Sequence, residues 1–422
     1  MIADAVPVRT RRDPVSGLWT LTAPAWSLRS PVVTGDAVLL LVDGQPTALD
    51  AATGQVRWRA VDRIPLGERV RPVLRPAGSR LVIAGDEPDR YQGGPVSLTA
   101  LDLTDGSRAW VRDAELLSGF LVDGPTNTVL LWQSRDSAPQ HLTALNLDDG
   151  SVRWRHEFSK LGAPVLVGER VIVSVPVVDE GGLFAFQVHT GVELWRDGAN
   201  TFHRELRCTG REVLARIAYD EWVVFAPGTG ERLHTRQHRL GWSTVNAHGD
   251  GTALWFKQRH RLLKRAPALG TARPARFLLR RPFSNGATSD TGLIELDGRV
   301  YAVVQSRHDF AKWRRLLGFS GQRVHTARAD RAFALLRPLR GRPVKRGAFV
   351  DMLAGPDRLY LAVVYHKHDE LLAYRDGRVL WSKTFPYRDV VPSGEHLLVL
   401  TRVDDQDQLL LIDGENGDTC RA

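Results

Sequence analysis

The pair His366 and His368 is the most specific local pattern for chemistry in this chain of 422 residues. One residue separates the two histidines, so on a β-strand both imidazoles would point to the same face. Two imidazoles on one face could begin a metal site, with Asp369 or Glu370 nearby, but a third ligand would have to come from elsewhere. The alternative is a pair of exposed strand histidines that binds no metal.

Two arginine doublets form a second kind of candidate site, one for anions. Arg281 follows Arg280, and Arg315 follows Arg314, with Trp313 beside the second doublet. A guanidinium can hold a phosphate or carboxylate through two parallel hydrogen bonds, and an indole ring can add a cation–π contact. Because side chains alternate along a strand, only one arginine of each doublet would face the ligand.

Histidines gather in the same part of the chain as these arginines, where a repeated motif described below becomes weak. Either of two alternatives would produce this combination: a binding site added to one side of the fold, or sequence drift in a segment that tolerates change. Under the first alternative the candidate binding residues are His203, His234, His248 and His308. The histidines of this segment are His203, His234, His238, His248, His260, His308 and His325.

The charge distribution supports an anionic partner for this segment. Residues 199–346 contain 29 Lys or Arg against 11 Asp or Glu, a net charge of +18, whereas the remaining residues carry 28 against 37, a net charge of −9. Such a segment could attract an acidic protein, a small anion or nucleic acid. Of the 57 basic residues 50 are Arg, a bias that a GC-rich genome also produces, so nucleic acid is the least favoured of these partners.

Catalytic motifs are missing from the sequence. It contains no phosphate-binding Gly-rich loop with Lys, no Gly-x-Ser-x-Gly and no His-Glu-x-x-His. The acidic segments 404–407 and 413–418 could hold calcium, but neither follows the twelve-residue loop pattern, which favours solvated hairpin turns. Cys208 and Cys420 are too few for a disulfide framework or a four-thiolate metal site.

A recurring sequence motif indicates which secondary-structure elements carry these residues. Ala-Leu-Asp-x-x-Thr-Gly-x-x-x-Trp occupies residues 48–58 and returns, with variation, at 100–110, 144–154 and 185–195, and in shortened form at 372–381. An apolar strand end, a polar turn, a glycine and a second strand are typical of a β-hairpin. Two further strand candidates precede most copies, so each unit is predicted to be a four-stranded meander.

Units of this kind bury their faces by stacking, which predicts an all-β fold: a single β-propeller domain over residues 1–422. The motif glycines recur about every 45 residues and give nine copies. Copies match well over 26–197, are degenerate over 198–350 and recover over 351–422. Residues 15–25 resemble the second half of a copy and residues 410–417 the first half, so the N-terminal strand is predicted to complete the last blade.

This sequence motif resembles the tryptophan-docking repeat of PQQ-like, quinoprotein-type β-propellers. The resemblance implies that the alanine leaves room between blades and that the tryptophan packs against the next blade, in a fold that usually has eight blades. The residues that inherit these structural roles are Trp58, Trp110, Trp154, Trp195 and Trp381, with Gly54, Gly106, Gly150 and Gly191.

The resemblance does not imply a cofactor for this chain. Quinoprotein dehydrogenases of the superfamily have a vicinal Cys pair and a bound metal, and no Cys-Cys pair occurs here, so PQQ is disfavoured and no cofactor is predicted. The N-terminus lacks the pattern of a signal peptide or lipobox, and no apolar run is long enough to span a membrane. We therefore expect a cytoplasmic protein, similar to relatives, often actinobacterial, that are sensor or scaffold modules.

Two functional hypotheses follow. The favoured one is a non-catalytic propeller that binds a protein or small anionic partner through rim loops or the basic segment. The other is an enzyme of a specialised pathway, with a pocket at the central channel mouth lined by His and Arg; two or more of its histidines should then line one concave pocket.

Overall fold

A computed structural model describes most of both ends of the chain and parts of its centre. Within the described residues the regular elements are β-strands, and none is a helix long and apolar enough to cross a membrane. The described residues are 7–64, 72–85, 94–133, 139–176, 181–198, 205–208, 212–218, 221–237, 245–246, 254–258, 261–265, 293–296, 299–305, 322–328, 337–338, 349–364, 369–375, 378–384 and 386–420.

The chain divides into two compact units. Unit 1 comprises Met1–Arg12, Trp19–Gln237 and Val403–Gln408, and unit 2 comprises Asp13–Leu18, His238–Arg402 and Leu409–Ala422. The prediction of one domain over the whole chain stays a prediction. The strands described in the two units fall into nine sheets, which matches the number of motif glycines, and the number of blades in a closed propeller also stays a prediction.

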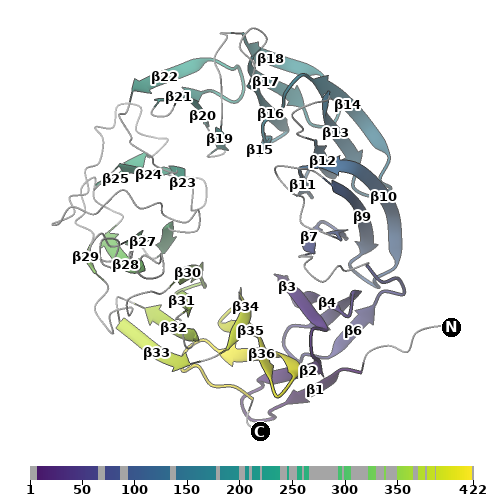
Figure 1. The fold of residues 1–422 in the computed structure, drawn as a ribbon, viewed down its shortest axis with the longest axis vertical. Coiled ribbons are helices and arrows are strands. Elements are labelled where there is room, and N and C mark those ends of the chain that lie inside the picture. The colour runs from purple at the N-terminus through teal and green to yellow at the C-terminus, as the bar shows by residue number, and fades with distance from the viewer. Residues whose placement is uncertain are drawn as a thin grey trace, which may run out of the picture. The chain divides into compact units, whose positions relative to one another are not determined.

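Unit 1 contains five four-stranded antiparallel sheets in which the strands follow one another in chain order (Figure 1). This is the meander predicted from the repeat. The sheets are β3 (Leu28–Thr34), β4 (Ala37–Val42), β5 (Gln45–Asp50) and β6 (Val56–Arg59); β7 (Val73–Ala77), β8 (Arg80–Ala84), β9 (Gly94–Asp102) and β10 (Arg108–Leu117); β11 (Gly119–Asp123), β12 (Thr128–Trp132), β13 (Gln140–Asn146) and β14 (Val152–Phe158); β15 (Val165–Val167), β16 (Arg170–Val175), β17 (Gly182–Gln187) and β18 (Glu193–Asp197); and β19 (Glu205–Cys208), β20 (Val213–Ala218), β21 (Glu221–Phe225) and β22 (Arg232–Gln237).

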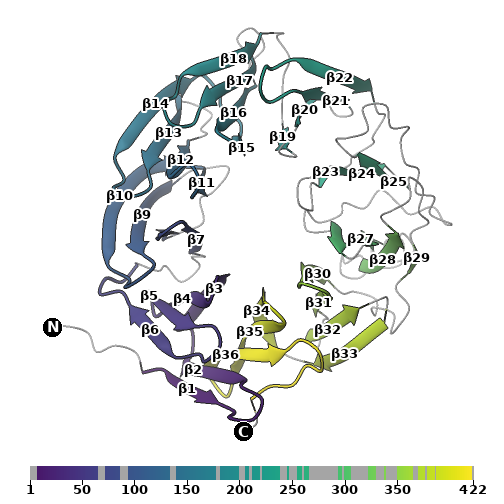
Figure 2. The ribbon, with the colours of Figure 1, turned by 180° about the vertical axis from the view of Figure 1, so that it is seen from behind.

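Unit 2 repeats the same meander. It contains one three-stranded sheet, two four-stranded sheets, and strands β34 and β35 beside most of β36. Figure 2 shows the strands of these sheets from behind. Their bounds are β23 (Val245–Asn246), β24 (Leu254–Gln258) and β25 (Arg261–Arg265); β26 (Leu293–Leu296), β27 (Arg299–Gln305), β28 (Gln322–Arg328) and β29 (Arg337–Pro338); β30 (Phe349–Ala354), β31 (Leu359–Val364), β32 (Asp369–Arg375) and β33 (Arg378–Thr384); and β34 (Tyr387–Ser393), β35 (His396–Val403) and β36 (Gln406–Asp413).

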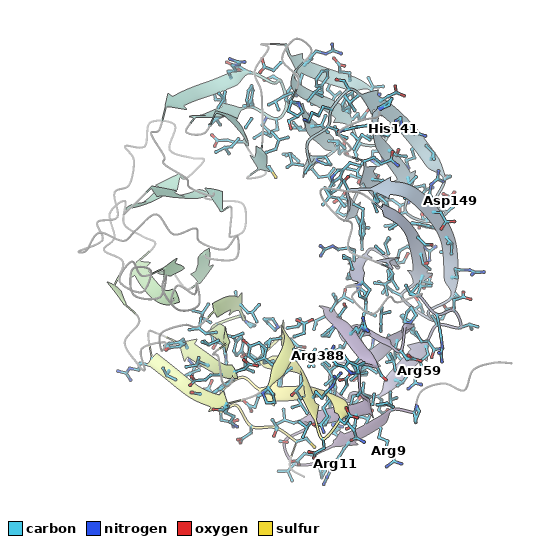
Figure 3. All side chains as sticks on the ribbon, in the orientation of Figure 1. Arg9, Arg11, Arg59, His141, Asp149 and Arg388 are labelled. Atoms are coloured by element: carbon cyan, nitrogen blue, oxygen red, sulfur yellow. The ribbon has the colours of Figure 1, made fainter. Side chains whose placement is uncertain are left out.

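Both ends of the chain contribute to unit 1. The strand β1 (Arg9–Arg12) pairs with β2 (Trp19–Pro24), and β2 lies next to β36, whose first residues, 406–408, belong to this unit. All four residues of β1 are exposed, and its Arg9 and Arg11 lie at the outer edge of the strand pair (Figure 3). The N-terminal strand is therefore found beside a C-terminal one, as predicted, while closure of a complete propeller stays a prediction.

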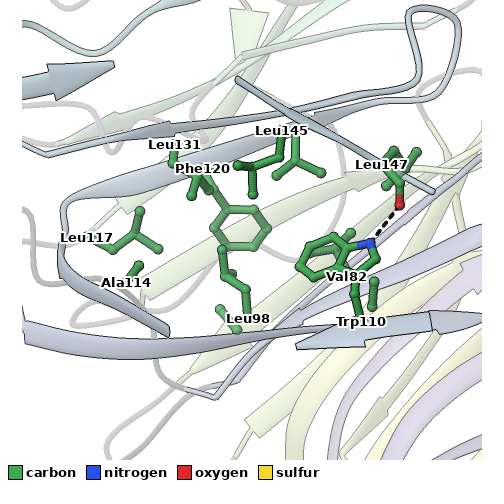
Figure 4. Close-up of a cluster of buried hydrophobic side chains, with 12 residues drawn as sticks. Val82, Leu98, Trp110, Ala114, Leu117, Phe120, Leu131, Leu145 and Leu147 are labelled. Carbon is green, nitrogen blue, oxygen red and sulfur yellow. Dashed lines mark hydrogen bonds between the residues drawn. The ribbon is translucent and has the colours of Figure 1, made fainter. Parts of the chain in front are cut away.

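The apolar core lies between consecutive sheets. In unit 1 the cluster between β7–β10 and β11–β14 includes Val82 and Leu98 from one sheet and Phe120 and Leu145 from the other, around the ring of Trp110 (Figure 4). Corresponding clusters join the other neighbouring sheets of this unit. Each sheet therefore depends on its neighbours for burial, because one short sheet cannot cover its own faces.

Candidate functional site

The repeated hairpin turn is the first candidate for function because it carries the most regular residues in the chain. Gly150 illustrates its geometry: φ is 70°, its amide donates to the carbonyl of Asn146 at 2.9 Å, and Asn146 accepts a further bond from the amide of Asp148 at 3.1 Å. A Cβ at Gly150 would lie 2.7 Å from Cδ2 of Trp110. Both the left-handed backbone and the contact with the ring therefore require glycine here.

Each docking tryptophan donates its indole N–H to a carbonyl of the next turn, three residues before that turn's glycine. Trp154 donates to Val188, three residues before Gly191, at 2.8 Å. The same bond occurs at 2.8–2.9 Å from Trp19 to Ala51, Trp58 to Leu103, Trp110 to Leu147, Trp195 to Pro227 and Trp381 to Gly414.

The six bonds assign a structural role to these tryptophans, as the resemblance implied. Trp58, Trp110, Trp154 and Trp381 are 7–8% exposed, and each ring lies against the glycine of the turn that it docks on. A ring buried in this way with its N–H satisfied is not available to stack on a cofactor.

The alanine of the repeat lies opposite the tryptophan on the neighbouring strand. Ala144 is the cross-strand partner of Trp154, and Ala48, Ala100, Ala185 and Ala373 pair in the same way with Trp58, Trp110, Trp195 and Trp381. Each ladder then shifts register, so one residue between the glycine and the tryptophan is extra in its strand and forms a β-bulge.

A second docking contact was not anticipated from the sequence. Two residues after the tryptophan, a cationic or imidazole side chain reaches the carbonyl of the same turn glycine. Arg112 donates to Gly150 at 3.3 Å, and Nε2 of His156 lies 2.8 Å from the carbonyl of Gly191. Lys383 makes the corresponding bond to Gly417. The sequence did carry a signal for this contact. An Arg, His or Lys stands two residues after the tryptophan, and alternation along a strand places both side chains on one face.

Ion pairs reinforce the same turns. Arg57 contacts Oδ2 of Asp36 at 2.7 Å and Oδ2 of Asp50 at 2.6 Å. The hydrogen bond from Arg57, together with bonds from Thr53, lowers the pKa of Asp50 to about 2. Because Asp50 also begins the hairpin turn, its ionised form stabilises the turn directly.

In unit 2 a larger ionic cluster occupies the equivalent place. Arg358, whose side chain is 4% exposed, contacts Asp357 at 2.6 Å, Glu395 at 2.9 Å and Glu415 at 3.3 Å. Arg375 contacts two of the same carboxylates, Asp357 at 3.0 Å and Glu415 at 2.6 Å. Each carboxylate in this cluster has an arginine partner, so the arrangement stabilises packing between sheets of this unit.

Most of the predicted binding residues lie outside the described residues. This applies to both arginine doublets and Trp313, to His203, His248 and His308, and to the metal candidates His366 and His368. Their roles as binding or metal-ligating residues stay predictions. Among the described residues no group of three or more His, Cys, Asp or Glu side chains could hold a metal ion.

His234 is the candidate binding residue whose backbone is described. It lies on β22, opposite Val224, and the ladder shifts register immediately afterwards, between Val224 and Phe225. His234 follows Gly230 by four residues, as Trp154 follows Gly150. It therefore occupies the register position of a docking tryptophan. Gly230, one of the weaker copies, is a true turn glycine with φ of 72°, and Trp195 docks on it.

These features define the class of the protein. Four-stranded antiparallel meanders joined by tryptophan docking are those of a β-propeller. A family model described as outer membrane protein assembly factor BamB matches residues 14–116 and 93–315, which is more than half of the chain. The chain belongs to this family of PQQ-like propellers. A comparison with curated proteins finds no match.

Solved structures are similar at low identity. BamB from Moraxella catarrhalis is 18% identical over 64% of this chain and 79% of that chain, with a TM-score of 0.40. A eukaryotic initiation factor is 10% identical over 90% of this chain and 96% of that chain, with a TM-score of 0.57. The Cps50 (Swd1) β-propeller domain of Myceliophteria thermophila is 16% identical over 65% and 95%, with a TM-score of 0.38. Of these three, the initiation factor supports the fold, and none supports a function.

Proposed function

We propose that this protein is a non-catalytic binding or scaffold module whose partner is a protein. The observation that carries the proposal is the use of the repeat itself: its tryptophans and turn glycines pack together between sheets, and its ion pairs hold the turns. The repeat residues thus build a rigid support. Recognition is left to the segments that depart from the repeat, as is usual for loops on a rigid scaffold. Membership of the family of an assembly factor is consistent with this role.

The basic segment 199–346 is the first part of the chain to test. Its net charge of +18 would attract an acidic surface on a protein partner, and Arg280 and Arg314 are the arginines that we expect to contribute. A small anionic ligand would use the same guanidinium chemistry and is the alternative outcome.

Partner capture by chemical cross-linking in the source cell, read by mass spectrometry, tests this proposal. The variant Arg280→Glu/Arg314→Glu is compared with the unaltered chain, and Arg155→Glu/Arg378→Glu provides the matched control. Both control arginines are exposed on described strands, and the two double variants change the net charge equally. We expect loss of a defined cross-linked protein in the first variant alone. Equal capture by all three chains would exclude the basic segment as the binding surface.

A further inference from the structure

One corner of unit 1 combines exposed apolar side chains with unusual backbone. We call it the Trp26 corner. It consists of residues 25–30, which form the connection after β2 and the start of β3, the turn 43–44 between β4 and β5, residues 61–64 after β6, and residues 403–405 at the turn between β35 and β36. All four segments belong to the same unit.

Hydrogen bonds of the backbone amides connect these segments. The amide of Asp43 donates to the carbonyl of Ser27 at 2.6 Å, and the amide of Ile64 donates to the carbonyl of Gly44 at 2.8 Å. The amide of Leu28 donates to Oδ2 of Asp407, which lies just beyond the turn 404–405, at 3.0 Å. The corner is therefore one assembled surface built from distant parts of the chain.

Three large apolar side chains project from this surface. Trp26 is 63% exposed, Val61 is 93% exposed and Val403 is 39% exposed. The docking tryptophans described above are buried or half-buried against the next turn, so an exposed tryptophan departs from the use of this residue in the fold. Tryptophan is also among the residues that contribute most binding energy at protein interfaces.

The backbone at Trp26 is held in a conformation that bulky residues avoid. Its φ is 66°, and Ser30, at an irregularity near the start of β3, has φ of 51°. Left-handed backbone at a bulky residue is a steric outlier, and such outliers persist where the surrounding structure imposes them, often at functional positions. Here the amide of Ser27 donates to the carbonyl of Pro24 at 3.2 Å and closes the turn that contains Trp26, and the bonds of Ser27 and Leu28 to Asp43 and Asp407 hold the residues that follow it.

The two residues that follow Trp26 in the chain are buried. Ser27 is 5% exposed and Leu28 is fully buried, as is the carboxylate of Asp407 that accepts the bond from Leu28. A backbone segment that is already held in place loses little conformational entropy when a side chain on it binds a partner. Trp26 is thus presented in the way that interface anchors are.

Charge indicates which partner would fit. Asp404 and Asp405 are exposed at the turn, and Asp43, about half exposed, lies 2.9 Å from Arg63. The chain outside residues 199–346 carries a net charge of −9. An arginine or lysine of a partner would gain attraction to the exposed carboxylates and could stack on the indole ring. An acidic segment would be repelled.

We propose that the Trp26 corner is a docking surface for a protein segment that carries Arg or Lys side chains next to an apolar residue. Trp26 and Val61 provide the apolar contact, and Asp404 and Asp405 provide the charge. This surface is additional to the basic segment considered above and prefers a partner of the opposite charge.

A displayed library of random twelve-residue peptides, selected on the full chain, tests the proposal. The same library is selected in parallel on Trp26→Gly, because glycine adopts φ of 66° without strain and so preserves the loop. We expect peptides that are enriched on the unaltered chain, lost on Trp26→Gly, and rich in Arg or Lys beside apolar residues. Enrichment of the same peptides on both chains overturns the proposal, as does a Trp26-dependent set without basic residues, or no enrichment at all.

Affinities of one selected peptide then separate the two kinds of contact. Trp26→Gly should weaken binding at least about tenfold, as expected of an anchor residue. Asp404→Asn/Asp405→Asn should weaken it less and reduce its dependence on salt, since asparagine tolerates left-handed backbone as aspartate does. Leu194→Ala removes an apolar residue of comparable exposure, 44%, outside the corner and should leave binding unchanged. An equal loss in Leu194→Ala would overturn the proposal.

Discussion

The backbone amide of Leu28 donates a hydrogen bond to Oδ2 of Asp407 across 3.0 Å, although 379 positions separate the two residues in the chain. Both residues are fully buried. The bond therefore attaches the C-terminal segment 403–408 to the strand that follows the N-terminal pair β1–β2, within one unit. Because it is shielded from water, an unmet amide at this position would be costly.

Replacing Asp407 by alanine should lower the free energy of unfolding by about 1–3 kcal/mol, since the amide of Leu28 would lose its buried acceptor. Asp407→Asn retains an oxygen acceptor and should cost less. Urea unfolding followed by tryptophan fluorescence measures both. Ser159→Ala, at an exposed bend, is the control for the effect of a substitution that removes no buried bond. If Asp407→Ala lowers the free energy of unfolding no more than this control does, the importance of the bond is contradicted.

The docking tryptophans should be among the most costly residues to replace. Trp58 and Trp154 are 8% exposed and each bonds the next turn. Their replacement by alanine removes a large buried ring and should cost about 3–5 kcal/mol. The same urea titration checks this, with Trp26→Gly as the control for loss of an exposed tryptophan. A loss below about 1 kcal/mol at Trp58 or Trp154 would refute the docking role.

The docking geometry was predictable because it depends on local patterns that repeat. The turn residues, the glycine and the tryptophan at a constant distance after it identified the hairpin, and the weak copy at Gly230 has the same turn and docking contact. The Trp26 corner was not predictable. Its bonds join segments as distant as Leu28 and Asp407, and an apolar residue in a loop carries no periodic signal of its exposure.

The turn glycines provide a test that separates backbone strain from crowding. A Cβ at Gly150 would lie 2.7 Å from the ring of Trp110, whereas Gly168, with a similar positive φ of 57°, has no atom within 4 Å of such a Cβ. Gly168→Ala should therefore cost about 1–2 kcal/mol from the left-handed backbone alone. Gly150→Ala should cost at least about 1 kcal/mol more, because the ring must move. Equal losses in the two variants, measured by urea unfolding, would show that the ring does not pack on Gly150.

Acid should weaken the turn that Asp50 begins. Arg57 and Thr53 lower the pKa of Asp50 to about 2 from its ordinary value of 3.8. A carboxylate with a depressed pKa in the folded state contributes stability that is present above the unfolded pKa and is lost as the pH falls through the folded pKa. The stability that depends on Asp50 should thus decline between about pH 4 and pH 2.

Because the pair with Arg57 is near the surface, added salt should reduce the effect. Urea midpoints at pH 6, 4 and 2.5, at low and high salt, measure it, and Asp50→Asn should flatten the decline. The exposed residue Asp113, replaced by asparagine, provides the control, and an identical acid profile for Asp50→Asn and the unaltered chain would contradict this role of the ion pair.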